Sequence, residues 1–294
     1  MSVFNIFKRK NTPLTRAVKN LRRNEIVMTP KACKGVKKPY DTKIGGMPYL
    51  FKGFDWPTYT DPETGVCRHL SFFCQVNLSD VKPFDKDGLL PPRGMLYFFY
   101  ECESMRWGFD VIDEGAARVI YVDTADRTDL EPIPVPDDVA EDYLIPEIPL
   151  AFKAAPSYPY FEEFDLLEDF DEVDFEEYDE ILEGLGVNVD EDIECHKLLG
   201  YANIIQNEML TEVERTSRGL DCGSPDDYQN TPANIEDEIE KCAKDWVLLC
   251  QLSTVETEDF EFMFGDCGMI YFYIRKQDLA VGDFSKVRFS VQCG

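Results

Sequence analysis

The chain of 294 residues carries 57 Asp or Glu against 30 Lys or Arg, which gives a net charge of −27 at pH 7. With 44% hydrophobic residues it has enough apolar material for a core, so a wholly disordered chain is excluded. No apolar run approaches the ~18 residues that a transmembrane helix requires, and we expect no membrane span.

Cysteine and histidine usage argues against disulfides and metal sites. The ten cysteines are scattered without any C-x-x-C motif, and neither of the two histidines lies at ligand spacing from a cysteine pair. Most of the thiols are therefore interpreted as small buried hydrophobes in a reducing environment. Since residues 1–10 also lack the apolar core of a secretory signal, the sequence predicts a cytoplasmic protein without a metal or cofactor.

The charge is divided unevenly along the chain. Residues 1–43 contain 12 Lys or Arg against 2 Asp or Glu, whereas the remaining residues contain 18 against 55. Because the acidic body would repel phosphates, we expect no nucleic-acid partner. Residues 1–40 are predicted to form a basic N-terminal arm, with a helix over 13–23 that is capped by Thr12 and docks on the acidic body.

Short segments rich in aromatic and β-branched residues, bounded by turn residues, predict β-strands. They fall into two groups, at 70–78, 94–100 and 118–122 and again at 246–252, 269–274 and 287–293. A helix is predicted over 232–246, where Ile235, Ile239 and Trp246 share one side. We therefore expect an α+β fold of mostly antiparallel sheets with a few peripheral helices.

The two groups of strands are separated by a connector over 131–195. Its first part is rich in proline, and residues 157–194 carry 17 acidic side chains with no Lys or Arg. Apolar residues recur there at helical spacing, which predicts an amphipathic helix with an acidic outer face. This face is either merely solvated or a binding surface for a basic protein, for which the candidate residues are Glu162, Glu163, Asp169 and Asp171.

The two groups of strands also match each other in sequence. Residues 73–76 (FCQV) align with 249–252 (LCQL), and 94–99 (GMLYFF) align with 268–273 (GMIYFY). The separation from the Gln to the Gly is 19 residues in the first copy and 17 in the second. We predict two duplicated β-rich units, 41–130 and 196–294, within one compact domain over 41–294.

Polar residues in and near these apolar strands are the candidate site. Gln75 and Gln251 occupy the same place in the two units, and an unpaired buried amide costs about 1–3 kcal/mol. Either each Gln ties its strand to a neighbouring loop, or the two line a shared polar cleft together with His196, Gln206 and Asp266. In the second case His196 and Asp266 are the acid–base candidates of an enzyme.

The chain contains, in order, KIGGMPYL at 43–50, CQVNL at 74–78, LPPRGMLYFF at 90–99, HKLLGY at 196–201 and FGDCG at 264–268. In order and spacing these motifs resemble the bacterial YwqG-like family, a domain of unknown function. The resemblance covers about residues 40–294 and departs from the family at Phe264, where Trp is usual, and at Leu199, where Gly is frequent. It implies a mostly antiparallel α+β protein and no established reaction.

Motifs for nucleophilic catalysis or nucleotide binding are missing from the sequence, including G-x-S-x-G and the P-loop. The leading hypothesis is a non-enzymatic binding or interaction protein. In one version it is an immunity-type protein that neutralises a basic toxin through the 157–194 face. The alternative is a small-ligand binder or a hydrolase-like enzyme that uses the polar cleft between the two units.

Overall fold

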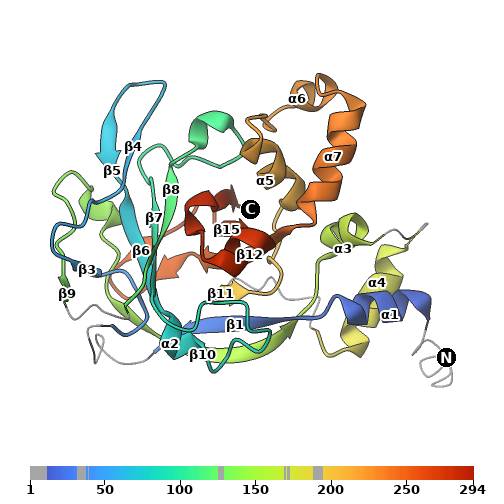
Figure 1. Cartoon of the computed structure of the whole chain (residues 1–294), viewed down its shortest axis with the longest axis horizontal. Helices are drawn as coiled ribbons and strands as arrows, with labels where there is room; N and C mark the ends of the chain where they lie inside the picture. Colours follow the sequence, from blue (N-terminus) through green and yellow to red (C-terminus); the bar gives the residue numbers. More distant parts are fainter. Residues whose placement is uncertain are drawn as a thin grey trace.

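The computed structural model describes residues 12–31, 38, 40–124, 129–168, 170, 173–187 and 195–294. Its centre is one ten-stranded sheet in which neighbouring strands are antiparallel (Figure 1). The expected mixed fold of helices and antiparallel sheets is confirmed. Across the sheet the strands are β16 (Arg288–Gln292), β15 (Met269–Arg275), β12 (Trp246–Ser253), β11 (His196–Leu199), β1 (Arg23–Pro30), β10 (Ile148–Ser157), β2 (Lys43–Ile44), β6 (Ser71–Asn77), β7 (Met95–Tyr100) and β8 (Ala117–Val122).

The sheet is curved so strongly that strands near its two ends face each other. β7 and β15 are each second from an end of the strand order, yet the rings of Phe98 and Phe272 lie 5.1 Å apart. The apolar core between them is continuous and includes Cys74 and Cys250, which are both fully buried. Burial of this shared apolar core is the main stabilising contribution that holds the facing ends of the sheet together.

Smaller elements cover the sheet (Figure 1). Three two-stranded ribbons pair β3 (Tyr49–Phe51) with β9 (Leu130–Pro132), β4 (Thr58–Thr60) with β5 (Cys67–His69), and β13 (Val255–Glu256) with β14 (Glu261–Phe262). The α-helices of the described residues are α1 (Pro13–Asn20), α2 (Leu78–Val81), α3 (Phe161–Leu167), α4 (Phe175–Gly184), α5 (Leu210–Ser217), α6 (Pro225–Gln229), α7 (Ala233–Ala243) and α8 (Lys276–Val281).

The basic N-terminal segment contributes a helix and also a central strand. Thr12 caps α1, because its Oγ1 accepts a hydrogen bond from the Thr15 backbone N–H at 3.0 Å. The apolar side of α1 packs against α3 and α4. The sequence-based prediction of an arm missed β1, in which Ile26 and Met28 alternate with half-buried residues and are themselves buried.

The acidic connector differs from the predicted single amphipathic helix. The structure has two shorter helices, α3 and α4, whose buried Phe164 and Tyr178 contact each other at 4.8 Å between ring centroids. The proline-rich part contains β10, a ten-residue strand that lies beside β1 in the middle of the sheet. The predicted strands and the helix near 232–246 are present, the helix as α7.

The strand order consists of two matching halves around a central pair. Read from the ends inward, β8-β7-β6-β2 corresponds to β16-β15-β12-β11, and both β6 and β12 carry a pairing irregularity just before their Cys-Gln dipeptide. In between, β1 pairs with β11 and β10 pairs with β2. Each central strand therefore pairs with the half that does not follow it directly in the chain, which ties the two halves together.

Candidate functional site

The two glutamines bind different loops. Gln75 accepts a hydrogen bond from the Tyr49 backbone N–H at 3.0 Å and donates to the Asp41 carbonyl at 3.0 Å. Gln251 accepts from the Asn203 N–H at 2.9 Å and donates to the Cys195 carbonyl at 3.0 Å. Both side chains are fully buried. Each amide thereby links a residue just before and a residue just after a short neighbouring strand, β2 for Gln75 and β11 for Gln251. These two hydrogen bonds fix the position of the short strand in the sheet.

Further contacts repeat in the two halves. The hydroxyl of Tyr97 donates to the Tyr49 carbonyl, and the hydroxyl of Tyr271 donates to the Asn203 carbonyl. In the same way, two buried lysines each form an ion pair with a glutamate of the central strand region. These pairs are Lys43 with Glu147 at 2.5 Å and Lys197 with Glu25 at 3.0 Å.

His196 is a buried hydrogen-bond acceptor. Its Nδ1 accepts from the Ser253 backbone N–H at 3.1 Å, just as Thr42 Oγ1 accepts from the Asn77 N–H at 2.9 Å in the other half. Burial lowers the pKa of His196 to about 4. The imidazole is therefore neutral at pH 7, with its proton on Nε2, and it acts there as a fixed acceptor for a strand N–H.

Gln206 and Asp266 are exposed, and the hydrogen bonds described below are made by their backbone groups, whereas the buried glutamines use their side chains. The Gln206 backbone N–H donates to Gln292 Oε1 at 3.1 Å, and the Asp266 carbonyl accepts from the Gly294 N–H at 3.0 Å. No hydrogen bond or ion pair joins Asp266 to His196, both of which the structure describes. The structure thus places these candidates in separate contacts rather than around one pair of reacting atoms.

The acidic candidates divide into exposed, buried and undescribed residues. Glu162 is exposed on α3, whereas Glu163 is only 2% exposed, so it does not belong to the surface. Its Oε2 has no hydrogen-bond partner, and burial raises the pKa of Glu163 to about 8. Asp169 and Asp171 lie outside the described residues.

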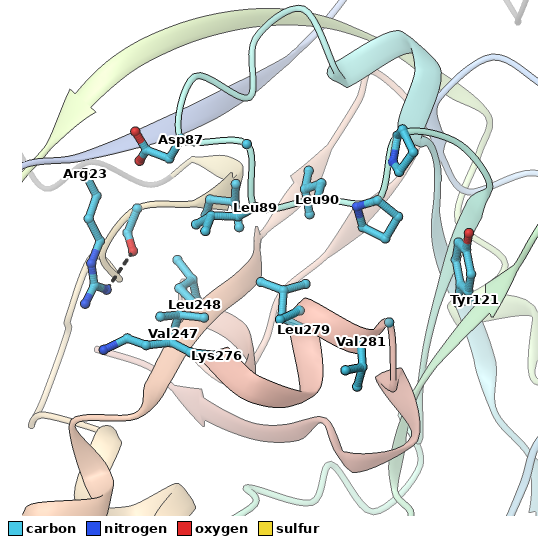
Figure 2. A pocket seen from close by; sticks show the side chains of 17 residues that line it. Arg23, Asp87, Leu89, Leu90, Tyr121, Val247, Leu248, Lys276, Leu279 and Val281 are labelled. Atoms are coloured by element: carbon cyan, nitrogen blue, oxygen red, sulfur yellow. Dashed lines mark hydrogen bonds between the residues drawn. The ribbon is translucent and has the colours of Figure 1, made fainter.

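A groove of about 760 Å³ lies where the two halves meet (Figure 2). One wall is the loop over 87–92, and the other is formed by β12 and α8. The middle of the groove is apolar, and Leu89 and Val281 at its border are 41% and 78% exposed. The volume lies within the range of about 300–1,000 Å³ that small-molecule sites occupy.

The polar side chains of the groove lie at its ends. Figure 2 shows Arg23, Asp87 and Lys276 at one end and Tyr121 at the other. The Arg23 guanidinium stacks on the Tyr201 ring at 4.0 Å and donates to the Gly200 carbonyl at 3.5 Å. Sequence reasoning missed these residues because they come from distant segments that only the sheet order brings together.

Lys276 and Arg23 lack a carboxylate partner. The ammonium of Lys276 donates to the Lys244 carbonyl at 2.7 Å, and neither cation forms an ion pair with an acidic residue of the described ranges. Partial burial lowers the pKa of Lys276, and the positive charge of Arg23 lowers it further, whereas the negative charge of Asp245 opposes the shift. Two neighbouring cations without an ion pair in the described part of the chain are unusual in so acidic a protein.

The described part of the chain holds no group of three or more His, Cys, Asp or Glu side chains that could bind a metal ion. None of its helices combines the length and the apolar character that crossing a membrane requires.

Comparison with known proteins shows the family and no activity. No curated protein matches the chain. One family profile, described as a domain of unknown function (DUF1963), matches residues 42–293. This match includes both halves of the sheet and most of the groove, but it begins after α1 and β1. The chain therefore belongs to the DUF1963 family.

Proposed function

We propose that this protein is a non-enzymatic binding protein and that the groove at the junction of the two halves is its ligand site. The observation that carries the proposal is the groove itself, which is large enough for a small molecule and has an apolar middle with polar ends. Exposed apolar side chains at its border support the same assignment, because such surfaces commonly mark binding sites. We further propose that the protein acts in the cytoplasm.

We also propose that the two halves arose by duplication and that the chain is YwqG-like. The strand order supports this, because it is the same in both halves when it is read from the two ends of the sheet inward. The hydrogen bonds support it too: Gln75 has the same kind of backbone partner as Gln251, and Tyr97 the same kind as Tyr271. In this proposal the glutamines have a structural task in each half. Binding is then left to the groove, whose walls come from both halves.

A bulky residue in the groove is expected to abolish binding of an apolar probe. Ala280 on α8 lines the groove, whereas Gln277 on the same helix is exposed and does not. We expect Ala280→Trp to weaken binding of the neutral dye N-phenyl-1-naphthylamine at least about tenfold, because the indole fills the space. Fluorescence titration measures this, and Gln277→Trp should bind the dye like the unmodified protein. Equal binding by both variants and the unmodified chain would refute the groove as the site.

The outer face of α3 and α4 favours a second candidate function, capture of a basic protein. Phe175 is 54% exposed there, next to the exposed acidic residues Asp174 and Glu176. An apolar anchor surrounded by negative charge suits a partner with a basic rim around an apolar spot. An immunity-type role against a basic toxin is one form of this proposal.

Charge reversal on this face is expected to slow association with a basic ligand. A labelled peptide of alternating Lys and Leu serves as the probe in stopped-flow measurements. For Asp174→Lys with Glu176→Lys we expect an association rate about tenfold lower at low salt, since steering by opposite charges is lost. The matched control reverses two exposed acids elsewhere, Glu256 and Glu258. An equal loss in the control would show that only the net charge matters and would remove this face from consideration.

A further inference from the structure

We propose that the ligand of the groove is an unbranched alkyl carboxylate, with its carboxylate between Arg23 and Lys276 and its chain along the apolar middle. This inference rests on the proposed function of the groove and specifies the chemistry of the ligand. Fatty acids have this chemistry, and so does any other molecule that ends in an alkyl carboxylate.

The cationic end of the groove is prepared for an anion. Stacking on Tyr201 and the hydrogen bond to the Gly200 carbonyl hold Arg23 in place, but a guanidinium has five N–H donors and this leaves several of them available. Lys276 lies in the same groove, and one carbonyl occupies only one of its three donors. A carboxylate between the two cations would accept charge-assisted hydrogen bonds and relieve their repulsion.

The charge balance favours one negative charge rather than two. Asp87 lines the same end, and its Oδ2 accepts a hydrogen bond from the Asn24 backbone N–H at 2.7 Å, which fixes this carboxylate in position. Asp87 and Asp245 offset part of the positive charge of Arg23 and Lys276, so little of it is left for a ligand to neutralise. A monocarboxylate adds only one negative charge, whereas a phosphate with nearly two would be repelled more strongly by Asp87.

The middle of the groove favours a hydrocarbon chain over a peptide. Its side chains there are apolar, namely Leu89, Leu90, Pro91, Val247, Leu248 and Leu279. A peptide would bring a buried N–H and C=O for every residue, and each group would need a partner that these side chains do not offer. At the far end the Tyr121 hydroxyl is already engaged, because it donates to the Arg93 carbonyl at 3.1 Å. Methylene groups have no such requirement and gain from burial.

Competition against the bound dye tests the inference. Dodecanoate, dodecyltrimethylammonium, dodecanol and tetraleucine are each titrated against N-phenyl-1-naphthylamine bound to the unmodified protein, the two ionic compounds below their micelle concentrations and the other two below their solubility limits. We expect dodecanoate to compete at least about tenfold better than the ammonium compound or the alcohol, because a charge-assisted hydrogen bond contributes enough free energy for such a difference in affinity. Stronger competition by tetraleucine than by dodecanoate would overturn the proposal in favour of a peptide ligand.

Variants separate this inference from the proposed function. Lys276→Gln and Arg23→Gln should each weaken dodecanoate about tenfold more than they weaken the neutral dye, and an unchanged circular dichroism spectrum shows that the variants are folded. Lys276→Glu should reverse the preference toward dodecyltrimethylammonium. The control is Lys241→Gln on α7, an exposed lysine outside the groove. If dodecanoate is unaffected while Ala280→Trp still blocks the dye, the groove is a binding site and the carboxylate assignment is wrong.

Discussion

Glu163→Gln is expected to stabilise the protein by about 2.5 kcal/mol more at pH 7 than at pH 5. Burial raises the pKa of Glu163 from its ordinary value of 4.5 to about 8, although the positive charge of Arg23 opposes this shift. The folded state therefore favours the protonated acid, whereas the unfolded chain ionises near pH 4.5. Between these values the penalty grows by about 1.4 kcal/mol for each pH unit, and folding becomes less favourable as the pH rises.

Denaturant unfolding at pH 5, 6, 7 and 8 measures this difference. Glutamine has the shape of the protonated acid but cannot ionise, so the gain of the variant should increase up to about pH 8 and then remain constant. Glu162→Gln is the matched control, because Glu162 is the exposed neighbour on the same helix. Parallel pH profiles for Glu163→Gln and the unmodified chain would mean that Glu163 is ionised in the folded protein and has found a partner.

The strands that could be predicted from the sequence are those with a distinctive local composition. Residues 94–100 and 269–274 are aromatic and β-branched, and they form the buried strands β7 and β15. The two central strands have no such signal. β1 lies in a basic segment, and β10 contains two prolines and three alanines, features that usually weaken a strand. Both segments form strands because each is hydrogen-bonded to a neighbouring strand on both of its sides.

The candidate site was even harder to predict from the sequence than the central strands, because it depends on tertiary structure. Sequence reasoning identified Gln75 and Gln251 as buried polar groups that need partners, which follows from the chemistry of an amide. Which backbone groups satisfy them depends on the path of the chain on both sides of β2 and β11. The groove could not be predicted, because Arg23 reaches Lys276 only through the pairing of β1 with β11 and the packing of α8. No local pattern in the sequence encodes that pairing.

Arg215→Met is expected to destabilise the protein by about 3–5 kcal/mol, which is the usual cost of breaking a buried ion pair. Arg215 on α5 is fully buried, and its guanidinium contacts Glu236 Oε1 at 2.5 Å. It also donates to the backbone carbonyls of Asp221 and Asp227, the latter at 2.9 Å, and lies 4.1 Å from the centre of the Tyr228 ring. One side chain therefore holds the whole segment between α5 and α7.

Methionine retains much of the buried hydrocarbon but removes these donors, so the carbonyls and the Glu236 carboxylate lose their partner. Urea unfolding measures the loss, and the matched control is Arg93→Met. Arg93 and its partner Asp123 are 58% and 51% exposed, and exposed pairs of this kind contribute about 0–1 kcal/mol. Proteolysis should cut the 218–232 segment of the Arg215 variant faster, while the groove, which contains none of these residues, still binds the dye. A loss below about 1 kcal/mol for Arg215→Met would show that the 218–232 segment is held by its other contacts and that this arginine is dispensable.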